Sequence, residues 1–394
     1  MRKPFRDLMK KITPIRKTVI FIRKVTYPKY RKLYDLLSEE LSSVKAENSE
    51  LKEKILSTDK SILNVCDWVG AIESSQNKEN LLIKTRMNAL NSATNIILYK
   101  NELERFPADE SFNPKVSIVM PVYNGEEYLS RALFCAFNQT YKNIEIIAVN
   151  DGSRDKTDEI LRSYGEKITY IKKENGGVSC ALNAGIKAMT GEYFAWLSHD
   201  DLIDSDHIEK LVEYLRHHTG EKVIPYSAFK FVDENGNLLT EGTINAKINI
   251  FDYKISVTDK YAPLLFGEIN GGSVLIPKEA FEKYGMFDES MRITQERDMW
   301  SRLIKEYRFV CIPYDTASIR IHSQQVSSAK DKVAEESNKK NLEIIDEIYQ
   351  VLKKENPNQA ETLCSYLCNH YRCNGNDYMC EKIKEKCAFE EENK

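Results

Sequence analysis

The sequence predicts an α/β fold built on a mostly parallel sheet, and three observations lead to that prediction. From residue 115 onward, short apolar runs rich in β-branched and aromatic residues alternate with helical patterns. The connections are short, which favours parallel strands joined by right-handed crossovers. Polar residues follow three of the strands: Tyr123, Asp151, and the pair Asp200 and Asp201. Because parallel strands end at one edge of a sheet, these residues outline a single ligand crevice.

The elements can be placed in order. A β-rich run starts at Val116 and is closed by Asn124-Gly125. We then expect helices over 128–138, 158–164 and 179–189, and strands over 144–150, 168–172 and 192–197. The last of these strands runs into Ser198, His199, Asp200 and Asp201. Taken alone, Asp200 could equally cap a helix beginning near Leu202, since Asp is a favoured N-cap residue.

Length and charge narrow the class of protein. The chain has 394 residues, enough for two domains, and a net charge of −3, which argues against a nucleic-acid-binding protein. It contains no run of 18 apolar residues, so we expect no transmembrane helix. The nine cysteines lack a secretory context and are predicted to be reduced thiols in a cytoplasm.

The first 32 residues form a basic arm. Residues 1–32 hold 12 Lys or Arg and one acid, a local charge of +11, interleaved with large apolar side chains. Such a segment can lie on an anionic membrane, where each cation contributes about 1 kcal/mol, which would place the protein peripherally on the inner membrane face. A solvated basic tail is the alternative interpretation.

A helical region is predicted over 33–106. Apolar residues from Leu37 to Ile72 follow alternating steps of four and three, the pattern of a coiled coil. Asn48 would occupy an a position, which fixes register and favours a dimer, so we expect a homo-oligomer formed through 34–72. A single amphipathic helix packed on the body of the protein is the alternative. Residues 107–114, with two prolines, mark a linker.

The tail, residues 331–394, reads as helical from Val333 to Lys354 and from Gln359 to Tyr371. It carries five cysteines whose spacing is not that of a zinc finger, so buried free thiols are the favoured interpretation. These are Cys364, Cys368, Cys373, Cys380 and Cys387.

Residues 115–328 contain many short motifs in a fixed order. They include Val116-Ser-Ile-Val-Met-Pro-Val-Tyr-Asn-Gly, Asn150-Asp-Gly-Ser-Arg-Asp-Lys-Thr, Asn183-Ala-Gly, Ser198-His-Asp-Asp, Asn270-Gly-Gly-Ser, Gly285-Met-Phe-Asp, Gln295-Glu-Arg-Asp-Met-Trp and Arg320-Ile-His-Ser. Together they are a far more specific signal than any one of them. With these motifs, residues 115–328 resemble the nucleotide-sugar half of family 2 glycosyltransferases of the bacterial cell-surface polysaccharide type.

The resemblance implies a GT-A fold over 115–330, Rossmann-like and mostly parallel, between the N-terminal coiled coil and the C-terminal helical tail. It also implies an inverting, metal-dependent transfer of a hexosyl or N-acetylhexosaminyl group. The donor would be a nucleotide diphospho-sugar, expected to be a UDP-sugar. The acceptor would be a hydroxyl of a glycan or of a lipid-linked molecule.

The resemblance also assigns residues to the donor. Pro121 to Tyr123 and Asp151 would hold the nucleobase, and Asp200 the ribose. Tyr123 can stack on a base, and Asp151 can accept an imide N–H. Gly176 and Gly177 would let the backbone approach the phosphates. The alternatives are core packing for Tyr123, a turn residue for Asp151 and a plain turn for the glycines.

By the same resemblance, Asp201 and His322 would bind Mn²⁺ or Mg²⁺. Carboxylates suit both ions, and a neutral imidazole suits Mn²⁺ better. The family often has a further Asp where this chain has Ser198, which removes one carboxylate from the site. For His322, a structural hydrogen bond in a loop is the alternative.

The family places its general base in a Glu-Asp or Gln-Asp pair before a helix. Here the pair is Gln295-Glu296, so Glu296 takes the position of the base and Asp298 is the fallback. Both could instead be acids that complement a helix N-terminus. Met299, Trp300 and Leu303, at helical spacing, are predicted to be core residues rather than a sugar platform.

A second function remains open. Ser198 and Glu296 depart from the family pattern, so the chain could be a catalytically weak scaffold that binds nucleotide sugars and is tethered by its coiled coil.

Overall fold

The computed structural model describes most of the chain beyond residue 102. The described residues are Ile96, Tyr99, Lys100, 103–239, 260–265, 269–323, Gln325, 330–373 and 375–387. They all belong to one structural unit, Leu81–Lys394. The predicted basic arm (1–32) and coiled coil (34–72) lie outside them, as does nearly all of the helical region 33–106.

The main sheet has five strands in the order β3-β2-β1-β4-β7. Its first four members run parallel and β7 runs antiparallel to β4, so the predicted, mostly parallel sheet is confirmed. The strands are β1 (Val116–Val122), β2 (Ile144–Asp151), β3 (Thr169–Lys173), β4 (Tyr193–Trp196) and β7 (Leu275–Pro277).

A second sheet has the order β5-β8-β6, formed by Leu202–Ile203, Arg308–Arg320 and Val223–Val232. The prediction of a helix from Leu202 is therefore wrong. Leu202 and Ile203 pair with Ser318 and Ala317 of β8, and the next helix, α7, begins at His207. Asp200 is thus not a helix cap and is available to the crevice.

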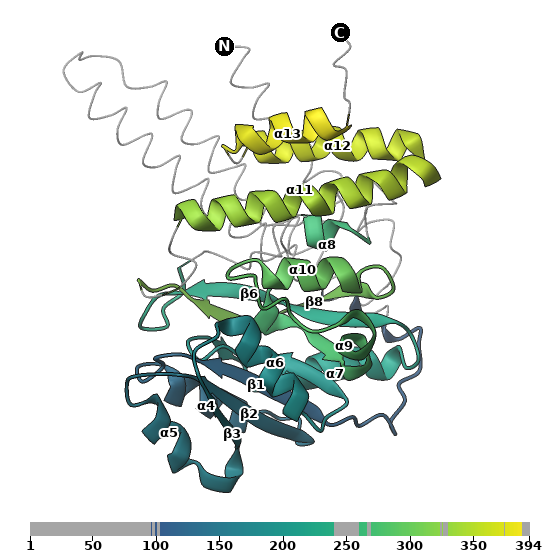
Figure 1. Cartoon of the computed structure of the whole chain (residues 1–394). Coiled ribbons are helices and arrows are strands. Elements are labelled where there is room, and N and C mark those ends of the chain that lie inside the picture. Colours follow the sequence, from purple (N-terminus) through teal and green to yellow (C-terminus); the bar gives the residue numbers. More distant parts are fainter. Residues whose placement is uncertain are drawn as a thin grey trace, which may run out of the picture. The chain divides into compact units, whose positions relative to one another are not determined.

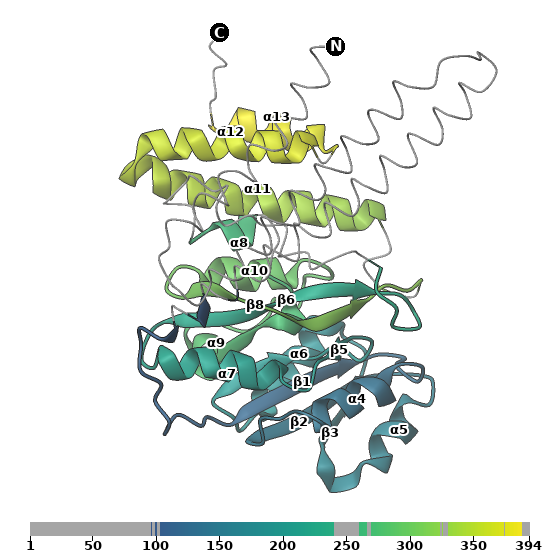
Figure 2. The same cartoon turned by 180° about the vertical axis from the view of Figure 1, so that it is seen from behind.

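Helices cover both faces of the main sheet (Figures 1 and 2). Alternate residues of β1 and β2 enter two different cores, as the period of two of a strand buried on both faces requires. Val119 and Ile147 pack with α6, whereas Ile118 and Ile146 pack with α4 and α7. The helices of this part of the chain are α4 (Leu129–Phe137), α5 (Thr157–Ser163), α6 (Val178–Ala188), α7 (His207–His217), α8 (Ala262–Leu265), α9 (Lys278–Tyr284) and α10 (Gln295–Leu303), with short 3₁₀ turns at Gly165–Lys167 and Gly271–Ser273.

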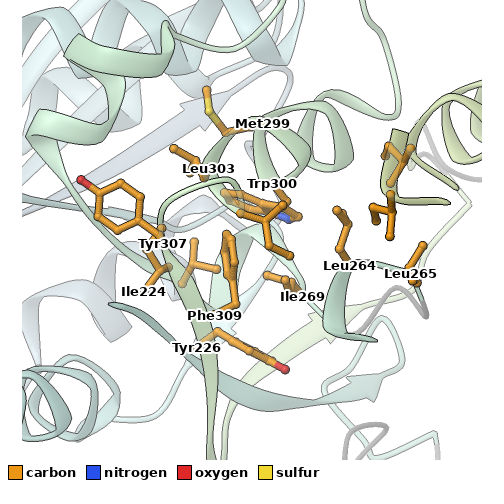
Figure 3. Packing of buried hydrophobic residues seen from close by; sticks show 14 of the residues in the cluster. Ile224, Tyr226, Leu264, Leu265, Ile269, Met299, Trp300, Leu303, Tyr307 and Phe309 are labelled. Carbon is orange, nitrogen blue, oxygen red and sulfur yellow. The ribbon is translucent and has the colours of Figure 1, made fainter. Parts of the chain in front are cut away.

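Helix α10 is anchored by three buried apolar side chains. Met299, Trp300 and Leu303 are buried, and Figure 3 shows them beside Tyr307 and Phe309. The rings of Trp300 and Phe309 meet edge to face with centroids 5.6 Å apart. These three side chains therefore belong to the core, as predicted, and they fix the helix that begins at Gln295.

The tail is helical. It forms α11 (Lys330–Glu355), α12 (Pro357–Cys373) and α13 (Asp377–Cys387), and both views show α11 between α10 and the other two helices. Among the described residues, no helix combines the length and the apolar character that crossing a membrane requires.

The tail cysteines differ in state. Cys368 and Cys380 are buried free thiols, but Cys364 is disulfide-bonded, so the prediction of free thiols is wrong for that residue. Tertiary packing decides which thiols meet, and spacing along the chain does not reveal it.

Candidate active site

Three strand ends meet at one edge of the main sheet. β1 lies between β2 and β4 and is parallel to both, so the residues that follow these strands emerge side by side. Tyr123 follows β1, Asp151 ends β2, and Asp200 and Asp201 lie shortly after β4. The polar residues that the sequence predicts at this edge therefore come from neighbouring strands.

The aromatic ring of Tyr123 is exposed at this edge of the sheet. It is 43% exposed, so the alternative of core packing is wrong. Pro121, two residues earlier, is buried inside β1. The pairing of β4 with β1 has already ended at Val119, so the ladder on that side needs no N–H from Pro121.

The Asp151 carboxylate organises the loop that precedes α6. Its Oδ1 accepts hydrogen bonds from Lys173 Nζ at 2.6 Å and from the Gly176 N–H at 3.0 Å, and its Oδ2 accepts one from the Gly177 N–H at 2.8 Å. Gly177 has φ +91°, a conformation that favours glycine. The two glycine N–H groups therefore point at Asp151, and the carboxylate shapes the loop besides facing the crevice.

Asp200 and Asp201 are held by a residue that the sequence reasoning left without a role, Arg320 at the end of β8. The Arg320 side chain is fully buried. Its backbone N–H donates to Asp201 Oδ1 at 2.9 Å, and its Nε donates to the Asp200 carbonyl at 2.8 Å. Its Nη1 donates to the carbonyls of Asp233 and Glu234 at 3.2 and 2.7 Å.

The Arg320 guanidinium thus links the backbone of Asp200 to the residues that follow β6. It also places a permanent positive charge beside Asp200 and Asp201. The ring of Tyr128 lies over it, 4.7 Å from the guanidinium carbon, and also contacts the ring of His322. A sequence signal was present: Arg320 lies only two residues before His322, which the resemblance already assigns to the metal.

His322 contacts Asp200, not Asp201. Its Nε2 lies 3.0 Å from Asp200 Oδ2. Burial, and then the charge of Asp200, raise the pKa of Asp201 well above its ordinary value, and the charge of Glu296 acts in the same direction. The three carboxylates therefore share one electrostatic environment.

The donor set fits a divalent cation bound by few protein ligands. His322 Nε2 and Asp200 Oδ2 offer a nitrogen and an oxygen ligand of the kinds that Mn²⁺ accepts, and they form a hydrogen-bonded pair at 3.0 Å. Within the described ranges, no three His, Cys, Asp or Glu side chains gather into a metal cage. A site of this kind leaves most of the coordination sphere to substrate phosphates and water, as is usual for Mg²⁺.

Glu296 lies in the first turn of α10, against the turn at Gly271–Ser273. Its Oε2 accepts a hydrogen bond from the Gly271 N–H at 3.2 Å. Asn270 holds that turn by accepting from the Gly272 N–H at 2.8 Å. Burial raises the pKa of Glu296 to about 7, although the Gly271 hydrogen bond and Arg297 oppose the shift. A carboxylate with this pKa is a competent base near neutral pH.

Asp298, the fallback base, is already engaged. Arg302 Nη2 lies 2.7 Å from its Oδ2, and Lys340 Nζ of α11 lies 2.8 Å from its Oδ1. Arg302 also donates to the carbonyls of Tyr284 and Met286. Both oxygens of Asp298 therefore hold neighbouring elements together, which favours a structural role.

Gly271 leaves no room for a side chain, so Gly271→Ala tests the contact with Glu296. A Cβ there would lie 2.4 Å from the Trp196 ring and 2.8 Å from Glu296 Oε1. The Trp196 ring belongs to the buried end of β4, so the Gly271 turn must shift away from both the ring and Glu296. We expect kcat to fall at least tenfold with little change in donor KM. Gly272→Ala is the control for inserting a methyl in the same turn, because its Cβ would come no closer than 3.3 Å to another atom and would not contact Glu296. Equal kcat values in the two variants would show that the contact between Gly271 and Glu296 does not matter for catalysis.

Comparisons with known proteins place this chain in a family. The family model described as "Glycosyl transferase family 2" matches residues 117–285. An uncharacterized glycosyltransferase of Rickettsia prowazekii is 42% identical over 220 residues, 55% of this chain and 67% of that protein. One from Rickettsia typhi is 45% identical over 195 residues, 50% of this chain. The chain spans only 60% of the length of the Rickettsia typhi protein.

The structural comparison gives the same fold. The crystal structure of Staphylococcus aureus TarS 1-349 in complex with UDP-GlcNAc aligns with a TM-score of 0.50 at 16% identity, covering 66% of this chain and 73% of that one. At this identity the likeness shows the fold alone. With the strand-end crevice, the Asn270-Gly-Gly-Ser turn and the sequence matches together, the chain belongs to glycosyl transferase family 2.

Proposed function

We propose that the protein transfers a sugar from a nucleotide diphospho-sugar to a hydroxyl group of a glycan or lipid-linked acceptor, with inversion at the anomeric carbon. The observation that carries the proposal is Glu296, a half-buried carboxylate with its pKa raised to about 7. Its charge acts on Asp201, so it lies within electrostatic reach of the proposed diphosphate site.

The reaction balances with one base. The Glu296 carboxylate takes the proton of the acceptor hydroxyl as its oxygen forms a bond to the anomeric carbon. On the opposite face of that carbon, the bond to the phosphate oxygen breaks, and its electron pair leaves with the nucleoside diphosphate. A single displacement of this kind inverts the configuration.

The other residues would hold the donor. The exposed ring of Tyr123 is available to stack on the base, and Pro121 fixes the strand that presents it. Asp151 keeps acceptor capacity beyond its three hydrogen bonds, because a carboxylate offers about four lone-pair sites. The loop at Gly177, shaped by Asp151, would lie beside the donor.

Asp200 and His322 would hold Mn²⁺ or Mg²⁺, with Asp201 next to Asp200 in the sequence. When bound, such an ion would act as a Lewis acid toward the departing diphosphate. The side chains themselves set the position: His322 bonds to Asp200, and Arg320 fixes both acids through backbone contacts.

A donor screen tests the proposal. UDP-, GDP- and dTDP-sugars are incubated with the full chain, with and without Mn²⁺, and release of nucleoside diphosphate is measured. UDP-GlcNAc is the first donor to test, because the S. aureus TarS structure holds it. We expect release from one class of donor, lost with excess chelator and with Asp200→Asn. Full activity in excess chelator would exclude a metal requirement. Donor binding without any release would favour the scaffold.

The remaining proposals concern residues outside the described ranges. We propose a homo-oligomer through 34–72 and association of the basic arm (1–32) with the inner face of an anionic membrane. They rest on the heptad pattern and on the charge of +11 in the arm.

A further inference from the structure

A carboxylate from the C-terminal tail binds the loop in front of α10. Oε1 of Glu336, on α11, accepts hydrogen bonds from the Ile293 N–H at 3.0 Å, the Thr294 N–H at 2.8 Å and the Thr294 hydroxyl at 2.8 Å. Burial alone would raise the pKa of Glu336, but these donors outweigh it and the pKa is lowered. Glu336 is therefore ionised at neutral pH, where its hydrogen bonds are charge-assisted and strong.

The bound loop leads directly to the proposed base. Thr294 is the N-cap residue of α10, yet its side chain makes no capping hydrogen bond within the helix. Its hydroxyl donates to Glu336 instead, and Glu296 follows two residues later. The direction in which α10 starts, and hence the position of the Glu296 carboxylate, depends on this contact from α11.

The same loop reaches the donor side. The guanidinium of Arg292 occupies the space that a side chain on Gly177 would need, with Nη1 2.7 Å from the Cβ position. Arg292 Nη1 also lies 3.4 Å from the Gly176 carbonyl. Arg292 thus contacts the loop at Gly176 and Gly177, and Thr294 begins the helix that carries Glu296.

A second contact from α11 holds the next turn of α10. Lys340 lies one helical turn after Glu336 and pairs with Asp298 at 2.8 Å, with side chains only 15% and 12% exposed. Two residues on one face of α11 therefore contact consecutive parts of the base-bearing segment. Residues four apart share a helix face, so one rigid element makes both contacts.

We propose that Glu336 is a positioning residue for the sugar transfer, so that α11 completes an active site whose other parts precede it. Lys340 supports this arrangement. The inference rests on the proposed function, because it acts through Glu296 as the base. It extends the functional site well beyond the family match, which ends at residue 285.

The first test needs no substrate. Amide hydrogen exchange is measured over residues 290–303 in the full chain and in Glu336→Ala, Glu336→Gln and Glu335→Ala. Gln keeps an oxygen acceptor for the three donors, and Ala keeps none. Glu335 is the matched control, since it is an exposed neighbour on the same helix. We expect at least tenfold faster exchange at Ile293 and Thr294 in Glu336→Ala alone. Equal exchange in all four proteins would overturn the proposal.

The second test separates positioning from general loss of structure. Release of UDP from UDP-GlcNAc, or from the donor most active in the screen, is followed against pH. In Glu336→Ala we expect kcat to fall at least tenfold, KM to stay within twofold, and the acid limb to move to lower pH as Glu296 becomes more hydrated. Glu336→Gln should restore most of kcat. A uniform loss with an unmoved acid limb would contradict positioning.

A double variant keeps the two proposals distinguishable. If Glu336 acts through Glu296, Glu296→Gln/Glu336→Ala should be no slower than Glu296→Gln alone, because residues that act as a unit are non-additive. Unchanged activity in Glu296→Gln would refute the proposed function. An inactive Glu296→Gln with a Glu336→Ala that behaves like Glu335→Ala would refute only the role of α11.

Discussion

Glu296→Gln is expected to lower kcat by at least two orders of magnitude while donor affinity barely changes. A sugar hydroxyl is a poor nucleophile at neutral pH unless its proton leaves during the attack. A positioned base typically contributes about 10²- to 10⁴-fold, roughly 3–5 kcal/mol of barrier. Gln keeps the size of the side chain and an acceptor for the Gly271 N–H, but it cannot take the proton. Steady-state kinetics and donor titration measure the two effects separately.

The pH dependence adds a second signature. Glu296 must be ionised to act, so kcat should rise with pH through about 7, where its raised pKa lies. The folded protein holds this proton up to pH about 7, whereas the unfolded chain releases it near 4.5. Stability therefore falls as pH rises between these values. Glu296→Gln removes that loss, so at pH 8 the variant should be more stable than the wild type, by up to roughly 3 kcal/mol.

Asp298→Asn is the matched control for this prediction. It lies two residues later on the same helix, but its oxygens bind Arg302 and Lys340. We expect it to lower the melting temperature and to change kcat only several-fold. The opposite pattern, an active Glu296→Gln and an inactive but stable Asp298→Asn, would move the base to Asp298. A product that retains the donor's anomeric configuration would exclude the single displacement.

Arg320→Met should be the most destabilising single substitution at the site. Met fills much of the same volume but leaves the carbonyls of Asp200, Asp233 and Glu234 without their donor. Each unsatisfied buried group costs about 1–3 kcal/mol. Glu234 is exposed, so water can replace the bond to its carbonyl, and we expect a loss of roughly 2–4 kcal/mol in the free energy of unfolding. The positive charge beside Asp200 and Asp201 is lost as well, so donor binding should also weaken.

Arg308→Met provides the control on the same strand. Arg308 begins β8 as Arg320 ends it, but its side chain is 49% exposed and lies 3.6 Å from Glu221. Exposed pairs contribute about 0–1 kcal/mol. Urea unfolding of both variants gives the comparison. Similar losses in the two would mean that the buried hydrogen bonds of Arg320 matter little.

The sequence is sufficient to predict four of the five strands of the main sheet and the edge where the candidate site lies. β1 and β4 are mostly apolar runs, so local pattern and parallel topology agree there. β7 is not among the predicted strands, because it has only three residues and pairs antiparallel with β4. Leu202 and Ile203 show where local pattern fails. Two residues form a strand only because β8, over a hundred residues later, offers them a partner, and no short window contains that information.

The arrangement of the candidate site could be predicted only in part, because some of its contacts also depend on residues far apart in the sequence. Three of its residues follow neighbouring strands, so the parallel topology of the sheet is enough to bring them together: Tyr123, Asp151 and Asp200. The pairing of His322 with Asp200 depends on side-chain geometry around Arg320. The engagement of Asp298 by Lys340 depends on how α11 packs, which the periodicity of α11 does not specify.

The hydrogen bonds between Glu336 and the loop before α10 limit how segments of this protein can be exchanged with those of relatives. A fragment that ends just before α11 would keep Glu296 and lose the helix that carries Glu336. A chimera would have to take the tail and the segment that bears Glu296 from the same relative. Otherwise the acceptor at 336 and the donors at 293 and 294 would not match. Modular exchange between relatives should therefore succeed at the linker before residue 115 and fail between α10 and α11.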